Sequence, residues 1–95
     1  MIEVEATFLS DVRRMTEEGK ANISLPEKSS VRDLIAILVE RYGDNFKEFM
    51  LSPENRLQKY VVILVNGRGV GILNGLETML HEGDSVLIMP AVGGG

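Results

Sequence analysis

Residues 29–43 read S-S-V-R-D-L-I-A-I-L-V-E-R-Y-G, and this stretch decides the fold. Its apolar residues recur at the spacing of one helical face, at positions 31, 34, 35, 38, 39 and 42. Ser30 and Asp33 resemble a capping box at the helix start, and Gly43 suits a left-handed stop at its end. The stretch therefore predicts a helix that buries one face.

Two strands are predicted before this helix. Residues 2–8 alternate between apolar and polar side chains, which is the pattern of a strand with one buried face. The alternation returns at residues 21–25, and Pro26 ends it. We expect the two strands to form a hairpin. Its loop would be the polar stretch 10–19, which is longer than usual and which we interpret as a flexible tip.

A short second helix and three further strands are predicted after the main helix. Apolar residues at positions 46, 49 and 50 indicate the short helix, and a loop follows up to residue 59. Residues 60–65 are continuously apolar, which is typical of a strand near the centre of a sheet, and Asn66-Gly67 indicates a turn. Residues 70–73 predict a short strand, and Ser85 to Met89 predict the last one.

The order of these elements predicts an α+β domain. One main helix and a short extra helix would pack across a mixed sheet of about four to five strands. Because the helix joins the second strand to the later ones, we expect one parallel pair, with the first and last strands in the middle. This layout is the β-grasp, or ubiquitin-like, arrangement. The domain is expected to span residues 1–89, and a flexible tail residues 90–95.

The composition excludes several classes of function. The 95 residues contain no cysteine, which excludes disulfides, thiolate metal sites and a catalytic thiol. The net charge of −4 argues against a nucleic-acid partner, because that binding depends on clustered Lys and Arg. The N-terminus lacks a signal-peptide pattern, and the longest apolar run is far shorter than a membrane span. We therefore expect a cytoplasmic protein without a membrane partner.

A glycine-rich run and a lone histidine are weak candidates for a site. The run from Gly67 to Gly71 matches neither of the common nucleotide-binding glycine motifs, and we interpret it as a turn. His81 stands near Glu77 and Glu82, but this cluster has no second nitrogen or sulfur donor. We expect a surface histidine and no metal site.

Two acidic pairs are equally weak candidates. Glu3 and Glu5 fall on the solvent face of a predicted strand, and Glu17 and Glu18 fall in a predicted loop. We interpret all four as solvated charges. Since no nucleophile, base and oxyanion donor can be assembled, the chain is not expected to be an enzyme by itself.

The chain ends in P-A-V-G-G-G, from Pro90 to Gly95. At an average glycine frequency of about 7%, three terminal glycines arise by chance in roughly one chain in 3,000. A vector-derived or frayed end is the other explanation. A tail without side chains can thread a narrow channel, and adenylation would make its carboxylate open to attack by sulfur. The reactive group would then be the carboxylate of Gly95.

The chain resembles the ubiquitin-like sulfur carriers of the MoaD/ThiS family, which includes the small subunit of molybdopterin synthase and the carrier of thiamin synthesis. The resemblance covers nearly the whole chain. It rests on the helix entry S-S-V-R-D-L-I-A-I-L, the strand ending V-I-L-V-N-G and the closing run L-H-E-G-D-S-V-L-I-M-P-A-V-G-G-G. The length of residues 44–59 favours the molybdopterin type over the thiamin type.

The resemblance implies that Gly95 is adenylated and then thiocarboxylated. It also implies that the preceding segment enters partner pockets. We expect docking to use an apolar patch on the sheet as well. The implied partner-binding residues are Met89, Pro90, Ala91, Val92, Gly93 and Gly94. Ala91 and Gly93 depart from the family pattern, in which a second proline and an alanine or serine are frequent. The departure implies a more flexible tail.

The implied partners are an E1-like adenylating enzyme, which uses ATP, a sulfur donor and the large subunit of molybdopterin synthase. No cofactor is expected on the chain itself. Three alternatives stay open: a protein modifier joined to lysines through Gly95, a thiamin-type carrier and an inert β-grasp interaction module. The sequence also leaves open whether the cofactor receives molybdenum or tungsten.

Overall fold

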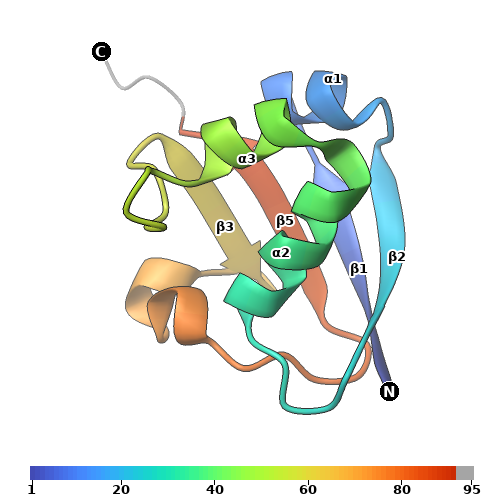
Figure 1. Ribbon diagram of the computed structural model, residues 1–95. Helices are drawn as coiled ribbons and strands as arrows, with labels where there is room; N and C mark the ends of the chain where they lie inside the picture. The colour runs from blue at the N-terminus through green and yellow to red at the C-terminus, as the bar shows by residue number, and fades with distance from the viewer. Residues whose placement is uncertain (92–95) are drawn as a thin grey trace.

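The computed structural model describes residues 1–91 and shows one sheet with its main helices on one face (Figure 1). The strands are β1 Ile2–Phe8, β2 Lys20–Leu25, β3 Val61–Val65, β4 Arg68–Gly69 and β5 Ser85–Pro90. The helices are α1 Asp11–Thr16, α2 Val31–Tyr42 and α3 Asp44–Met50, and two short 3-10 turns are η1 Val70–Ile72 and η2 Gly75–Glu77.

The sheet has five strands in the order β2-β1-β5-β3-β4. The two central strands, β1 and β5, are parallel, and Ala6 lies opposite Val86. All other neighbours are antiparallel. The expected placement of the first and last strands in the middle is confirmed, and so is the β-grasp fold. A parallel central pair is possible because α2 lies between β2 and the later strands in the chain.

The main helix α2 begins with the predicted capping box. Ser30 Oγ accepts a hydrogen bond from the Asp33 N–H at 3.3 Å, and Asp33 Oδ2 accepts one from the Ser30 N–H at 2.9 Å. At the other end, the Gly43 N–H donates to the Val39 carbonyl at 2.8 Å. Gly43 has the expected positive φ of 93°, but its ψ of −169° lies outside the left-handed helical region. This extended ψ turns the chain directly into α3.

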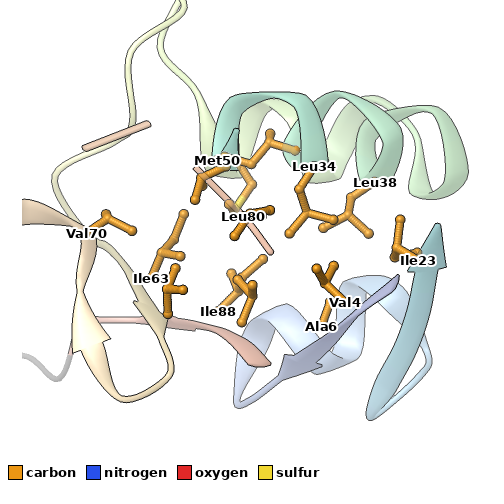
Figure 2. Packing of buried hydrophobic residues seen from close by; sticks show 14 of the residues in the cluster. Val4, Ala6, Ile23, Leu34, Leu38, Met50, Ile63, Val70, Leu80 and Ile88 are labelled. Carbon is orange, nitrogen blue, oxygen red and sulfur yellow. The ribbon is translucent and has the colours of Figure 1, made fainter. Parts of the chain in front are cut away.

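One apolar core lies between the sheet and the helices. Figure 2 shows Leu34 and Leu38 of α2 above Val4 of β1 and Ile88 of β5, and all four side chains are buried. The alternation predicted for residues 2–8 holds, since the even-numbered residues of β1 are buried. The core is therefore formed by the apolar residues that recur every 3.6 positions in α2 and every second position in the strands, as the sequence predicts.

The predicted flexible loop at residues 10–19 is wrong, because residues 11–16 form α1. Val12 is fully buried, and the Thr16 hydroxyl donates to the Glu18 carbonyl at 2.8 Å. Glu17 ends the helix in a left-handed conformation, with φ of 57°. Only Val12 and Thr16 of this helix are buried, which gives a weak periodic signal, so the helix depends on tertiary contacts.

The predicted strand at residues 70–73 is also wrong. The strand is the two-residue β4, which precedes this segment, and residues 70–72 form η1. Val70 is buried near Ile63 of β3 (Figure 2), whereas Ile72 is 78% exposed. The turn at Asn66-Gly67 is confirmed, and both residues have the positive φ of a tight hairpin.

The predicted short second helix is confirmed as α3. Phe46 and Met50 are fully buried, and Phe46 meets the rings of Phe8 and Tyr42. The Phe8 ring contacts the Tyr42 ring edge-on, with centroids 5.6 Å apart. This aromatic cluster fixes α3 against the end of α2, near the carboxyl end of β5.

Candidate functional site

The tail leaves the domain from the centre of the sheet, because β5 lies between β1 and β3. Pro90 is still paired with Val61 of β3, so the last strand ends one residue later than Met89, its expected end. The Ala91 N–H donates to the Tyr60 carbonyl at 2.6 Å. The expectation that the chain leaves the sheet at Pro90 is therefore wrong, because β3 offers a partner as far as Ala91.

Pro90 ends the pairing with β1 on the other side of β5. The Leu9 N–H donates to the Ile88 carbonyl at 3.1 Å, and the next step of this parallel ladder would need an N–H from residue 90. Proline has none. The Leu9 carbonyl accepts a hydrogen bond from Val12 of α1 instead, at 3.2 Å. At Pro90, β5 is thus no longer hydrogen-bonded to β1 but is still paired with β3.

Three of the predicted partner-binding residues lie within the described part of the chain. Met89 and Pro90 are half-buried, and Ala91 is exposed. The other predicted site residues lie outside the described residues: Val92, Gly93, Gly94 and Gly95. We define the tail root as Met89, Pro90 and Ala91.

An apolar patch that includes Met89 of the tail root lies on the sheet face away from α2. It consists of Val62, Leu64, Leu87 and Met89, which we call the outer patch. Val62 is opposite Met89 and Leu64 is opposite Leu87, so the four side chains are neighbours. They are half-buried and do not belong to the core cluster. An apolar patch of this kind on a sheet face is typical of a protein-binding surface.

The rest of the same face is polar. Glu3, Glu5 and Thr7 of β1 face outward there, followed by Lys20, Asn22 and Ser24 of β2. The Lys20 ammonium and the Glu5 carboxylate are 3.8 Å apart. The face is therefore divided into a polar half at β1 and β2 and an apolar half at β3 and β5, and the tail root lies on the apolar half.

Large apolar side chains flank the tail root. Tyr60, whose carbonyl holds Ala91, is 45% exposed. Its ring contacts the ring of Phe49 of α3, with centroids 5.3 Å apart. Leu9, whose backbone N–H donates to the Ile88 carbonyl, is 40% exposed on the other side of β5. Large apolar side chains thus lie on both sides of the point where the tail begins.

Glu18 is a partly solvated charge, as interpreted, with 38% of its side chain exposed, but it also has two side-chain partners that the sequence did not indicate. Its carboxylate accepts hydrogen bonds from the Tyr42 hydroxyl and from Arg41 Nη2, the latter at 3.2 Å. The hydrogen bond from Tyr42, opposed by partial burial and aided by the Arg41 charge, lowers the pKa of Glu18. Burial, together with the hydrogen bond to Glu18, raises the pKa of Tyr42 to about 12. This cluster ties the chain just after α1 to the end of α2.

The histidine predicted to lie at the surface does so, with 73% of its side chain exposed. Its backbone N–H donates to Asp84 Oδ2 at 2.7 Å, which closes the turn before β5. Among residues 1–91, no group of three or more His, Cys, Asp or Glu side chains is placed to hold a metal ion. None of the helices in this part of the chain is long and apolar enough to cross a membrane.

Comparison with protein families shows to which family the chain belongs. The model described as the ThiS family matches residues 6–95. The chain belongs to the ThiS family. It is a ubiquitin-like sulfur carrier, as its closing run predicts, and such proteins are small carrier subunits rather than catalysts.

Three relatives illustrate the range of this family. A candidate sulfur carrier protein of Archaeoglobus fulgidus is 41% identical over 69 residues, which cover 73% of this chain and 77% of that protein. Small archaeal modifier protein 3 of Haloferax volcanii is 28% identical over 94 residues, which cover 99% and 100%. The solved structure of a candidate molybdopterin converting factor subunit 1 from Pyrococcus furiosus has a TM-score of 0.78 at 29% identity, and the match covers 97% and 100%.

The sequence predicted a patch on the sheet of this ThiS-family carrier but did not name its residues. The signal was present in the two uninterrupted apolar runs that became β3 and β5. Because the main helices lie on one face, every second residue of such a run must face away from the core. This rule selects Val62, Leu64, Leu87 and Met89.

Proposed function

We propose that the protein is the small, sulfur-carrying subunit of molybdopterin synthase. An E1-like enzyme would adenylate the carboxylate of Gly95 with ATP, and a sulfur donor would convert the adenylate into a thiocarboxylate. The large synthase subunit would then receive this sulfur for the pterin precursor. ATP is available in the cytoplasm, where we place the reaction. The observation that carries the proposal is the outer patch beside the tail root.

The chemistry needs a carboxyl end and no thiol on the chain. A carboxylate oxygen attacks the α-phosphorus of ATP, and pyrophosphate leaves. The sulfur nucleophile then attacks the carbonyl carbon, and AMP leaves with the oxygen that bridged carbon and phosphorus. The net change is one oxygen replaced by one sulfur. The sequence contains no cysteine that could compete for the activated acyl group.

The geometry of the tail root supports docking of this kind. β5 is held by β3 as far as Ala91, so the domain presents the tail from a fixed point. The outer patch and the aromatic pair Phe49 and Tyr60 lie beside that point. A partner that binds these apolar side chains can receive the residues that follow Ala91 at the same time. The name of the Pyrococcus furiosus relative supports molybdopterin as the end product.

A second candidate function is protein modification through the same activated glycine. The match to small archaeal modifier protein 3, which spans nearly the whole of both chains, favours this candidate. Here a lysine amine of a target would attack the adenylate or a thioester, and an isopeptide bond to Gly95 would form. A thiamin-type carrier would share the first two steps and differ only in the acceptor of the sulfur. An inert interaction module would undergo none of these steps.

Intact-mass measurement tests the proposal. The protein is incubated with the activating enzyme, ATP and sulfide, beside a variant that lacks Gly95 and a reaction without ATP. We expect one oxygen to be exchanged for sulfur in the full chain with ATP, but neither in the variant without Gly95 nor in the reaction without ATP. The pterin precursor should then be converted when the large subunit is added. Glycine remnants on target lysines would support the modifier. An unchanged mass would leave only the inert module.

A further inference from the structure

The two edges of the sheet differ in how well they are protected. β4 is an edge of only two residues, one of them Arg68, whose charge discourages pairing with another strand. β2 is an edge of six residues without proline or a bulge, and within residues 1–91 its only strand partner is β1. A strand edge of this length offers backbone hydrogen bonds to another strand.

The register with β1 shows which backbone groups of β2 face outward. The Phe8 N–H donates to the Gly19 carbonyl at 3.0 Å, and bonded pairs alternate along an antiparallel ladder. Ala21, Ile23 and Leu25 therefore bond to β1, opposite Ala6, Val4 and Ile2. The N–H and C=O groups of the alternate residues point away from the sheet. These residues are Lys20, Asn22 and Ser24.

We propose that β2 pairs antiparallel with β2 of a second copy of this chain, around a twofold axis at Asn22. In this register Asn22 is opposite the partner copy's equivalent asparagine, and Lys20 is opposite the equivalent of Ser24. Each of the three outward residues then donates and accepts a backbone hydrogen bond. The register centred on Ile23 would place Lys20 opposite Pro26, which has no N–H to donate.

The side chains agree with the register centred on Asn22. On the helix side, Ala21 comes opposite Ile23, so a small side chain meets a large one. On the outer side, two asparagine amides meet at the axis and can hydrogen-bond to each other. Lys20 comes opposite a serine, and its own charge already lies 3.8 Å from Glu5. No like charges are brought together at this edge.

Such a dimer keeps the sulfur-carrier site of each copy open. β2 is separated from β5 by β1, so the outer patch and the tail root lie away from the paired edges. A twofold axis across antiparallel strands would direct the two tail roots to opposite ends of a continuous sheet. The inference rests on the free edge and would stand even if the proposed function failed.

Sedimentation equilibrium of the full chain, from micromolar to millimolar concentration, tests the dimer. We expect the mass to rise from that of one chain toward that of two. Asn22→Lys and Asn22→Glu place like charges at the axis, and each should weaken association by roughly tenfold. An equimolar mixture of the two variants should restore association through a heterodimer. The control pair Asn45→Lys and Asn45→Glu, at an exposed position of α3, should associate like the unmodified chain.

Amide spectra provide a readout that does not depend on the variants. On concentration, the N–H resonances of Lys20, Asn22 and Ser24 should shift and gain protection from exchange, whereas those of Ala21 and Ile23 should change little. Circular dichroism checks that each variant is folded. A single-chain mass at every concentration would overturn the proposal, as would a mixture of charged variants that fails to associate.

Discussion

The Tyr42 hydroxyl donates a hydrogen bond to the carboxylate of Glu18, and this contact joins the end of α2 to the chain just after α1. Arg41 contributes a second hydrogen bond to the same carboxylate, and its guanidinium lies 5.7 Å from the centre of the Tyr42 ring. Since α1 packs beside β5, the contact also steadies the region from which the tail emerges.

Removal of the Tyr42 hydroxyl should destabilise the domain. We expect Tyr42→Phe to lower the free energy of unfolding by about 1 kcal/mol, because the ring contacts with Phe8 and Phe46 remain and only the hydrogen bond is lost. Urea denaturation followed by circular dichroism measures the change. Tyr60→Phe is the control, because Tyr60 is 45% exposed and its hydroxyl has no protein partner within residues 1–91. Equal stability of the two variants would contradict the role of Tyr42.

Stability should fall on acidification through the pKa of Glu18. The folded protein lowers this pKa below its ordinary value of 4.5, chiefly through the hydrogen bond from Tyr42. Below pH 4.5 the unfolded chain therefore binds more protons than the folded one, and unfolding becomes easier as the pH falls. Glu18→Gln should lack this contribution. The unmodified chain should be more stable than Glu18→Gln at pH 6, and this difference in unfolding free energy should shrink as the pH falls to 3. A difference that stays constant would show that the pKa of Glu18 is not lowered in the folded protein.

Stability should also fall on the alkaline side, through Tyr42. Burial and the bond to Glu18 raise its pKa from 10.0 to about 12, so between these values the unfolded chain ionises while the folded one does not. Ionisation of the unfolded chain favours unfolding, and the loss should be complete near pH 12. Tyr42→Phe has no such group. The stability difference between this variant and the unmodified chain should therefore narrow between pH 10 and pH 12 in urea titrations.

The capping box of α2 should contribute measurably to stability. Ser30→Ala removes the acceptor for the Asp33 N–H, and we expect the free energy of unfolding to fall by about 0.5–2 kcal/mol. Ser30→Thr should restore most of it, because a threonine hydroxyl accepts at a helix start and can also donate to Asp33 Oδ2, as the serine hydroxyl does at 3.2 Å. Ser24→Ala, on the exposed face of β2, is the matched control and should change stability by less. Equal effects of the two alanine substitutions would show that the cap is not needed.

The outer patch should determine the affinity for the activating enzyme. Leu87→Asp places a charge within the patch, opposite Leu64, and we expect the KM for adenylation to rise about tenfold with kcat within about twofold. Ser24→Asp adds the same charge to the polar half of that face and should leave both constants unchanged. ATP–pyrophosphate exchange measures both constants. If Leu87→Asp had an unaltered KM, docking through the outer patch would be excluded.

Much of the fold could be predicted because its signals are local. The capping box, the helical stripe of α2 and the alternation in β1 and β2 each extend over a few neighbouring residues. α1 could not be predicted in this way, because its two buried residues, Val12 and Thr16, stand in a stretch that is otherwise mostly polar. η1 was missed for a related reason. In a strand, Val70 and Ile72 would lie on the same face and be buried together. In the structure Val70 is buried and Ile72 is exposed, and the apolar sequence did not reveal this difference.

The site shows the same division between local and tertiary information. Glu18 was interpreted as a loop charge because its partners, Arg41 and Tyr42, are more than 20 residues away in the sequence. The last strand was expected to end at Met89, and Pro90 was assigned to the flexible tail 90–95. Its missing N–H faces β1, however, and the bond between Ala91 and Tyr60 on the other side is unaffected.

The sequence by itself determined the β-grasp order of elements, the absence of a thiol and the family to which the closing run belongs. Periodicity and composition are properties of neighbouring residues, so no tertiary information was needed for them. Only the tertiary structure decided that Val62, Leu64, Leu87 and Met89 form one patch beside the tail root, and that β2 has an open edge. Both depend on which strands lie side by side, and strand pairing joins residues far apart in the chain.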